Sequence, residues 1–283
     1  MQIWNETEWL VRAPARPAEG PVWDIDRQSL WWVDIMEGHV HLWDRHSGED
    51  TVYDVGEAVG ALALRVDGSV LVALQTRLAF LDPDSGEVET FVPLEGNRPA
   101  NRANDGKAGP DGAFWIGTMA VDASPEAGAL YHVTGGGEVS RLLNDVSISN
   151  GLDWLDDNHL YYIDSLAHGV DVLEVDRDAW TVLSRSRVLD IDPDDGLPDG
   201  MTLDAEGCLW VAVHGGGQVR RYSQRGELLG WVEVPMSLVT CCAFGGPDLT
   251  ELYVTVAADD GVAGGLLRCD VGIAGRPPYR FAG

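Results

Sequence analysis

A turn followed by a short apolar strand recurs six times along this chain of 283 residues. The six segments are DRQSLWWVDI, VDGSVLVAL, PDGAFWIGT, DDNHLYYID, AEGCLWVAV and DLTELYVTV, with Leu30, Val70, Phe114, Leu160, Leu209 and Leu252 as equivalent residues. These residues lie 40 to 49 positions apart, and each segment is followed by a third alternating stretch and usually by a shorter fourth. Because four short strands repeated at this spacing are typical of propeller blades, the pattern predicts an all-β, six-bladed β-propeller, with residues 1–283 forming one domain.

The two ends of the chain predict how such a ring closes. The last repeat has little sequence left for a fourth strand, whereas the segment ETEWLVRA stands before the first repeat. An N-terminal strand that completes the last blade would remove an exposed sheet edge. We therefore expect residues 6–13 to close the ring.

Composition excludes several classes of protein. A hydrophobic content of 45% with 11 Trp is incompatible with intrinsic disorder, and no run approaches the roughly 18 apolar residues of a membrane span. The formal net charge of -27 repels phosphate backbones and anionic lipid. We therefore expect neither nucleic acid nor membrane as a partner, while the oligomeric state stays open.

The cysteines and the N-terminal segment bear on the compartment. Cys208, Cys241, Cys242 and Cys269 fit no metal-binding spacing, and the adjacent pair is badly placed for an ordinary disulfide. The opening MQIWNETEWLVRAP lacks the basic and apolar regions of a signal peptide. These features predict buried thiols in a reducing, cytoplasmic environment.

The Asn150-Gly151 pair is the sequence signature of a two-residue hairpin, yet its surroundings do not fit one. The turn before the next strand is already supplied by residues 156–158, so the pair stands at the start of a strand. Ten residues before the six equivalent apolar residues lie Gly20, Gly60, Asn104, Asn150, Asp199 and Cys242, with Glu19 beside the first. These positions are predicted to begin the innermost strands.

The shared position of these residues in the repeat points to a site. Asn, Asp and Gly are also ordinary turn formers, which is the simpler explanation at any single position. Equivalent positions in a propeller, however, surround one axis, and polar groups that converge on a channel mouth indicate a ligand or metal site.

Three of the side chains suit a divalent metal. Glu19, Asn150 and Asp199 offer two carboxylates and one amide carbonyl, which are hard oxygen donors. Such donors favour Ca²⁺, Mg²⁺ or Mn²⁺, although Zn²⁺ also accepts carboxylates. Three protein ligands leave positions open for water and substrate, so that a bound metal could polarise a carbonyl and acidify water.

The sequence resembles a known family in several ordered motifs. EGPVW, NRANDGK, GTM, ISNGLDW, YYIDS, PDGMTLDAEGCLWVA and CCAFGG are similar to the motifs of the SMP-30/gluconolactonase family of regucalcin-like proteins and sugar lactonases. The resemblance extends along nearly the whole chain. It implies a six-bladed propeller that opens an aldonolactone to its aldonic acid with one divalent metal ion, Ca²⁺ first among the candidates.

The resemblance also implies a role for individual residues. Glu19, Asn150 and Asp199 fall on the metal ligands, and Asp199 also falls on the proposed general base. Arg102 and Asn104 fall on positions that contact the substrate. Asp122 falls where many relatives carry Glu, so that its side chain is shorter than theirs.

Two other motifs in the chain fit their usual functions less well. His214 begins an HGGG segment like the oxyanion loop of lipases, but the chain has no G-x-S-x-G motif. The acidic stretch DIDPDDGLPDG lacks the Gly and the final Glu of an EF-hand loop. Two alternatives stay open: a propeller that hydrolyses organophosphates or other esters with the same metal, and a calcium-binding propeller without turnover.

Overall fold

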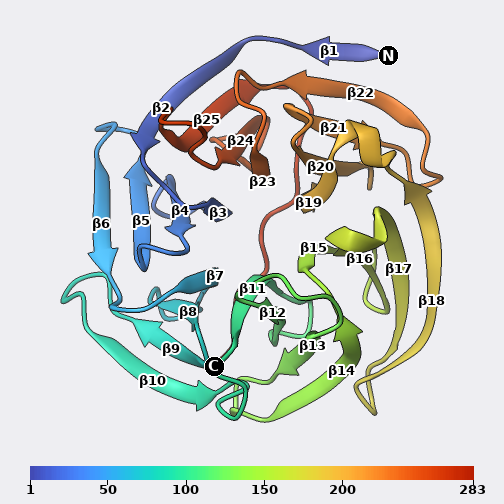
Figure 1. The fold of residues 1–283 in the computed structure, drawn as a ribbon. Coiled ribbons are helices and arrows are strands. Elements are labelled where there is room, and N and C mark those ends of the chain that lie inside the picture. Colours follow the sequence, from blue (N-terminus) through green and yellow to red (C-terminus); the bar gives the residue numbers. More distant parts are fainter.

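The computed structural model describes all 283 residues as a closed ring of six sheets (Figure 1). Blade 1 contains β3 (Ala18–Asp24), β4 (Ser29–Asp34), β5 (His39–Asp44) and β6 (Asp50–Asp54). Blade 2 contains β7 (Val59–Leu64), β8 (Val70–Leu74), β9 (Arg77–Leu81) and β10 (Val88–Pro93). Blade 3 contains β11 (Asn101–Ala108), β12 (Phe114–Ala120), β13 (Gly128–Val133) and β14 (Val139–Val146). The predicted six-bladed β-propeller is confirmed.

The second half of the ring follows the same antiparallel order. Blade 4 contains β15 (Ser149–Trp154), β16 (His159–Asp164), β17 (Gly169–Asp176) and β18 (Thr181–Asp190). Blade 5 contains β19 (Leu197–Leu203), β20 (Leu209–His214), β21 (Gln218–Tyr222) and β22 (Leu228–Glu233). Blade 6 contains β23 (Val239–Gly245), β24 (Glu251–Val256) and β25 (Gly264–Asp270). Two short 3₁₀ helices, η1 (Ser165–Ala167) and η2 (Pro193–Asp195), complete the secondary structure. None of its helices has the length and apolar character needed to cross a membrane.

The N-terminal strands connect the ring across two blades. β2 (Thr7–Ala13) pairs antiparallel with β25 and completes blade 6, as the sequence predicts. β1 (Gln2–Trp4) lies parallel to β22 as a fifth strand of blade 5, a pairing that sequence analysis missed. Trp4 packs against Trp210 with ring centroids 5.1 Å apart, which buries an apolar side chain at this junction.

Every inner strand carries one extra residue at the same level of the channel. The register against the second strand shifts between Glu19 and Val22, Val59 and Ala61, Ala103 and Gly106, Ser149 and Leu152, Pro198 and Met201, and Val239 and Cys241. A bulge of this kind interrupts the alternation of a strand and redirects side chains. Asn104, Asn150 and Asp199 all lie within these bulges.

One of the six predicted positions is wrong. In blade 6 the bulge contains Thr240, whereas the sequence pattern selected Cys242. Leu252 pairs with Phe244, while the equivalent Leu209 pairs with Leu203, so the hairpin of blade 6 is two residues longer. A fixed offset of ten residues therefore overshoots the bulge in this blade.

The Asn150-Gly151 pair serves the contact between two inner strands. A Cβ atom on Gly151 would lie 2.6 Å from the carbonyl oxygen of Asp199 and 2.8 Å from the amide nitrogen of Met201, both on β19. Gly60 stands in the same relation to β11, where a Cβ atom would lie 2.4 Å from the carbonyl oxygen of Ala103. Glycine therefore allows neighbouring inner strands to approach closely at the level of the bulges.

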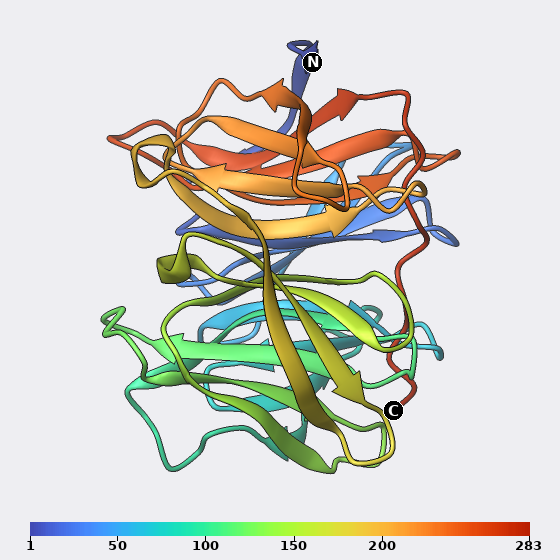
Figure 2. The same ribbon diagram turned by 90° about the vertical axis from the view of Figure 1, so that its right-hand side faces the viewer.

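After β25, residues 271–283 form a C-terminal tail that crosses one face of the ring (Figures 1 and 2, red). The tail forms hydrogen bonds to Asp24 of blade 1, Leu64 of blade 2, Gly112 of blade 3, Trp154 of blade 4, Ala205 of blade 5 and Leu249 of blade 6. Near its end Phe281 is fully buried among the side chains of blades 2 and 3. The tail is thus bound to all six blades.

We predict that Gly151→Ala lowers the free energy of unfolding by about 1–3 kcal/mol, the usual cost of overpacking a close contact. Gly96→Ala is the matched control, because a Cβ atom there would have no heavy atom within 4 Å. Denaturant unfolding of both variants and the parent measures the difference. Equal stability of the two variants would show that β15 and β19 can move apart without a loss in the free energy of unfolding.

Candidate active site

The three predicted metal ligands lie at the starts of inner strands on one face of the ring. Glu19 is on β3, Asn150 on β15 and Asp199 on β19. Their exposed fractions are 6%, 5% and 8%. Because all six inner strands run in the same direction around the channel, these residues from blades 1, 4 and 5 meet at the same mouth.

The carboxylates of this mouth crowd negative charge into a buried space. Burial raises the pKa of Glu19 well above its ordinary value, and the charges of Asp199 and Asp105 raise it further. Burial likewise raises the pKa of Asp199, again with Asp105 adding to the effect, while Arg102 lowers the pKa of both. The guanidinium of Arg102 therefore acts on two buried carboxylates, Glu19 and Asp199, both of which Asp105 also influences.

The donor set fits a divalent cation. Asp199 Oδ1 is buried and has no hydrogen-bond partner within the protein, which is costly for a carboxylate oxygen. Two carboxylates and an amide oxygen at one point are the hard ligands that Ca²⁺ and similar ions prefer. A cation there would neutralise the crowded charge and satisfy the orphaned oxygen.

Hydrogen bonds determine which atom Asn150 presents to the site. Its Nδ2 donates to Ser165 Oγ at 2.9 Å, and Ser165 Oγ in turn donates to the carbonyl oxygen of Pro198 at 2.7 Å. The amide group is therefore oriented with Oδ1 on the other side, where it accepts a hydrogen bond from Asn104 Nδ2 at 3.2 Å and keeps a second lone pair. Asn150 presents an oxygen, as a ligand of a hard cation must.

Arg102 and Asn104 form a connected pair beside the carboxylates. Arg102 Nη1 donates to Asn104 Oδ1 at 2.6 Å and to the carbonyl oxygen of Ala103 at 3.0 Å. Asn104 Nδ2 also donates to the carbonyl oxygen of Ser149 at 2.7 Å. Burial lowers the pKa of Arg102 to about 10, against the opposite effect of Glu19 and Asp199. Arg102 thus remains a cation near neutral pH.

Asp122 stands apart from the other five predicted residues. It lies on the loop after β12, is exposed, and accepts a hydrogen bond from the backbone amide of Ser124 at 3.0 Å. It has no hydrogen bond or ion pair with Arg102 or Asn104. The structure therefore assembles Glu19, Arg102, Asn104, Asn150 and Asp199 but leaves Asp122 outside the group.

Sequence analysis missed two residues at this mouth. Asp105 is buried beside Asn104 in the bulge of β11, and burial raises its pKa to about 6. His214 ends β20, and its Nδ1 lies 3.5 Å from Asp199 Oδ2. The predicted hairpin could have indicated His214. The second strand of an antiparallel hairpin ends opposite the start of the first strand, and Leu197 at the start of β19 pairs with His214 at the end of β20.

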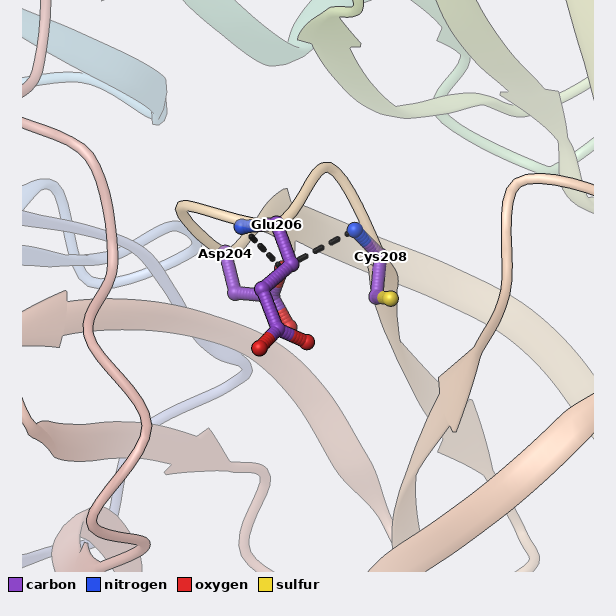
Figure 3. A group of neighbouring side chains, drawn as sticks. All are labelled: Asp204, Glu206 and Cys208. Atoms are coloured by element: carbon purple, nitrogen blue, oxygen red, sulfur yellow. Dashed lines mark hydrogen bonds between the residues drawn. The ribbon is translucent and has the colours of Figure 1, made fainter.

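A second cluster of potential metal ligands, Asp204, Glu206 and Cys208, has a structural role (Figure 3). Asp204 Oδ1 accepts hydrogen bonds from the backbone amides of Glu206 and Cys208, both at 2.9 Å, which closes the turn between β19 and β20. Its Oδ2 accepts from Trp210 Nε1 at 3.0 Å and from Arg221 Nε at 2.9 Å. The guanidinium of Arg221 already balances the charge of this carboxylate. The cluster therefore lacks the unbalanced negative charge of the channel mouth.

The chain matches a known family and known sequences. Residues 17–258 match the family described as SMP-30/Gluconolactonase/LRE-like region. Regucalcin of Gallus gallus is 38% identical, with 95% of each chain covered.

Two solved structures are similar over nearly their whole length. A calcium-binding protein, regucalcin, from Agrobacterium tumefaciens has a TM-score of 0.92 at 32% identity, with 99% of each chain covered. A luciferin-regenerating enzyme has a TM-score of 0.91 at 33% identity, with 98% of this chain and 99% of that chain covered. The propeller described above therefore belongs to the SMP-30/gluconolactonase/LRE-like family.

Proposed function

We propose that this protein is a metal-dependent lactonase that hydrolyses an aldonolactone to the aldonic acid. The observation that carries the proposal is the meeting of two buried carboxylates, an oriented amide oxygen and a free guanidinium at one channel mouth. A lactone offers a polar carbonyl and several hydroxyl groups, and this mouth offers partners for both. The family name and its gluconolactonase members agree with this substrate class.

In this proposal Glu19, Asn150 Oδ1 and Asp199 hold one divalent ion. We favour Ca²⁺, because all three ligands are hard oxygens and a similar protein is described as calcium-binding; Zn²⁺, Mg²⁺ and Mn²⁺ are the other candidates. When bound, the ion would polarise the lactone carbonyl and acidify water.

Asp199 acts as the general base as well as a ligand. Its carboxylate accepts a proton from the attacking water while the new carbon–oxygen bond forms at the lactone carbonyl. The ring carbon–oxygen bond then breaks, and the ring oxygen takes the proton that Asp199 accepted, which gives a hydroxyl group and regenerates the carboxylate.

Arg102 and Asn104 bind the substrate. The hydrogen bond between them holds the guanidinium at the mouth, where its remaining N–H groups can donate to a ring oxygen or hydroxyl. Asp122 is proposed to accept a hydrogen bond from a hydroxyl at the outer end of the substrate, because it is exposed on a loop of the same blade. Binding at several points would hold the carbonyl in place for attack.

A panel of five- and six-membered aldonolactones, assayed with and without a chelator, tests the activity. Hydrolysis that the chelator abolishes and added Ca²⁺ restores is the expected result. Turnover of an aryl ester or organophosphate but of no lactone would favour the alternative hydrolase, and metal binding without any turnover would favour a calcium-binding propeller.

We predict that Glu19→Gln weakens Ca²⁺ binding by about tenfold or more, because it removes one of two ligand charges while keeping the side-chain shape. Calorimetric titration with Ca²⁺ measures the dissociation constant. Glu89→Gln, at an exposed position of β10, removes the same charge far from the site and should bind as the parent does. Unchanged affinity in Glu19→Gln would make Glu19 a turn residue only.

We predict that Asp199→Asn keeps a weakened metal site but loses roughly 10²-fold or more in kcat, the usual contribution of a general base. The amide can still offer an oxygen to the metal but cannot accept the proton. The measurement is kcat at saturating Ca²⁺ and at saturating Zn²⁺. Saturation removes the effect of weaker metal binding, so that any remaining loss of kcat reports the loss of the general base. Turnover near that of the parent at saturating Ca²⁺ would leave Asp199 as a ligand alone.

A further inference from the structure

A cavity of about 380 Å³ lies at the opposite end of the channel from Glu19 and Asp199. All six inner strands contribute residues near their C-terminal ends to its wall, and most of these are apolar, as are Trp23, Leu62 and Phe244. The C-terminal tail covers it with Pro277, Pro278 and Tyr279. Its volume lies within the range of pockets that bind small molecules.

Two cations face this apolar cavity. Lys107, the only lysine of the chain, donates to Asp153 Oδ2 at 2.9 Å and to the carbonyl oxygen of Met201 at 3.1 Å, and 26% of its side chain is exposed. These contacts use two of the three ammonium hydrogens. Arg276 of the tail donates to the carbonyl oxygen of Trp154 at 3.0 Å.

Arg276 has no carboxylate partner, which is unusual in so acidic a protein. The chain has 46 Asp and Glu residues, and each other partly buried arginine outside the candidate active site has a carboxylate within 4.0 Å. Arg102 of the candidate active site is the one further exception. Both unpaired guanidinium groups thus lie at a mouth of the channel, and each is available to an anion.

The one acidic group of the cavity is already balanced. Asp153 Oδ2 accepts hydrogen bonds from Lys107, from Thr202 Oγ1 at 3.2 Å and from the backbone amide of Leu203 at 3.0 Å. Its Oδ1 accepts from the backbone amide of Trp154 at 2.8 Å. Among the residues that line the cavity, Lys107 and Arg276 are therefore two cations beside the single carboxylate of Asp153.

We propose that this cavity binds a small carboxylic acid with an aromatic or branched apolar body. The carboxylate pairs with Arg276, and the body packs against Trp23, Phe244 and Tyr279. A sugar or sugar acid does not suit the cavity, because most of its hydroxyl groups would face apolar walls without hydrogen-bond partners. The ligand class thus differs from that of the candidate active site.

Calorimetric titration with 3-phenylpropanoate at pH 7 tests the proposal, with the neutral 3-phenylpropanamide as the matched ligand. We expect one binding site for the carboxylate and at least tenfold weaker binding of the amide. Arg276→Gln should weaken binding of the carboxylate roughly ten- to hundredfold, as loss of a charged hydrogen bond does. Arg276→Lys, which keeps the charge but loses the planar fork, should lie between the parent and Arg276→Gln.

Two controls locate the binding. Arg225→Gln removes an exposed arginine that also has no carboxylate partner, and Arg102→Gln removes the guanidinium of the other mouth. Both should bind 3-phenylpropanoate within about twofold of the parent. No binding to the parent at 10 mM probe, equal binding of the amide, or loss of binding in Arg102→Gln with retention in Arg276→Gln would each overturn the proposal.

Discussion

The bulge that interrupts every inner strand is the constraint on which the arrangement of this molecule depends. A regular strand would direct successive side chains to the two faces packed against neighbouring blades. The extra residue breaks this alternation at one level, so that Asn104, Asn150 and Asp199 can meet at the channel. Small residues such as Gly60 and Gly151 are needed at the same level, because the inner strands approach one another there. The close contacts between inner strands and the polar side chains of the site therefore occur at the same positions of the repeat.

The electrostatics of the mouth oppose the stability of the fold. Three carboxylates are buried there, with Arg102 acting on Glu19 and Asp199 and Lys107 on Asp105, and burial raises the pKa of each carboxylate. The surrounding apolar clusters between the blades, with buried residues such as Trp32, Trp115 and Trp210, stabilise the ring enough to tolerate this cost. A locally unfavourable arrangement held by a stable framework is typical of sites that bind charged ligands.

The sequence predicted those features that depend on short-range periodicity. Alternating strands and regular turns predicted six blades and the closing strand β2, and the common position in the repeat selected residues that the structure assembles, such as Glu19 and Asp199. The same rule failed at Cys242, because one hairpin is two residues longer. β1 and the position of the tail were not predictable in this way, since each depends on contacts between distant parts of the chain. The orientation of Asn150 likewise depends on Ser165 and Pro198 of other segments.

The tail that binds all six blades has a consequence for cooperativity. In an open array of repeats each unit contacts only its neighbours, so that single units can unfold in turn. Here residues 271–283 connect blades that are not adjacent: Gly275 pairs with Asp204 of blade 5, whereas Phe281 pairs with Arg65 of blade 2. Opening of any one blade therefore breaks contacts that also hold the far side of the ring. We therefore expect the six repeats to unfold together as one cooperative unit.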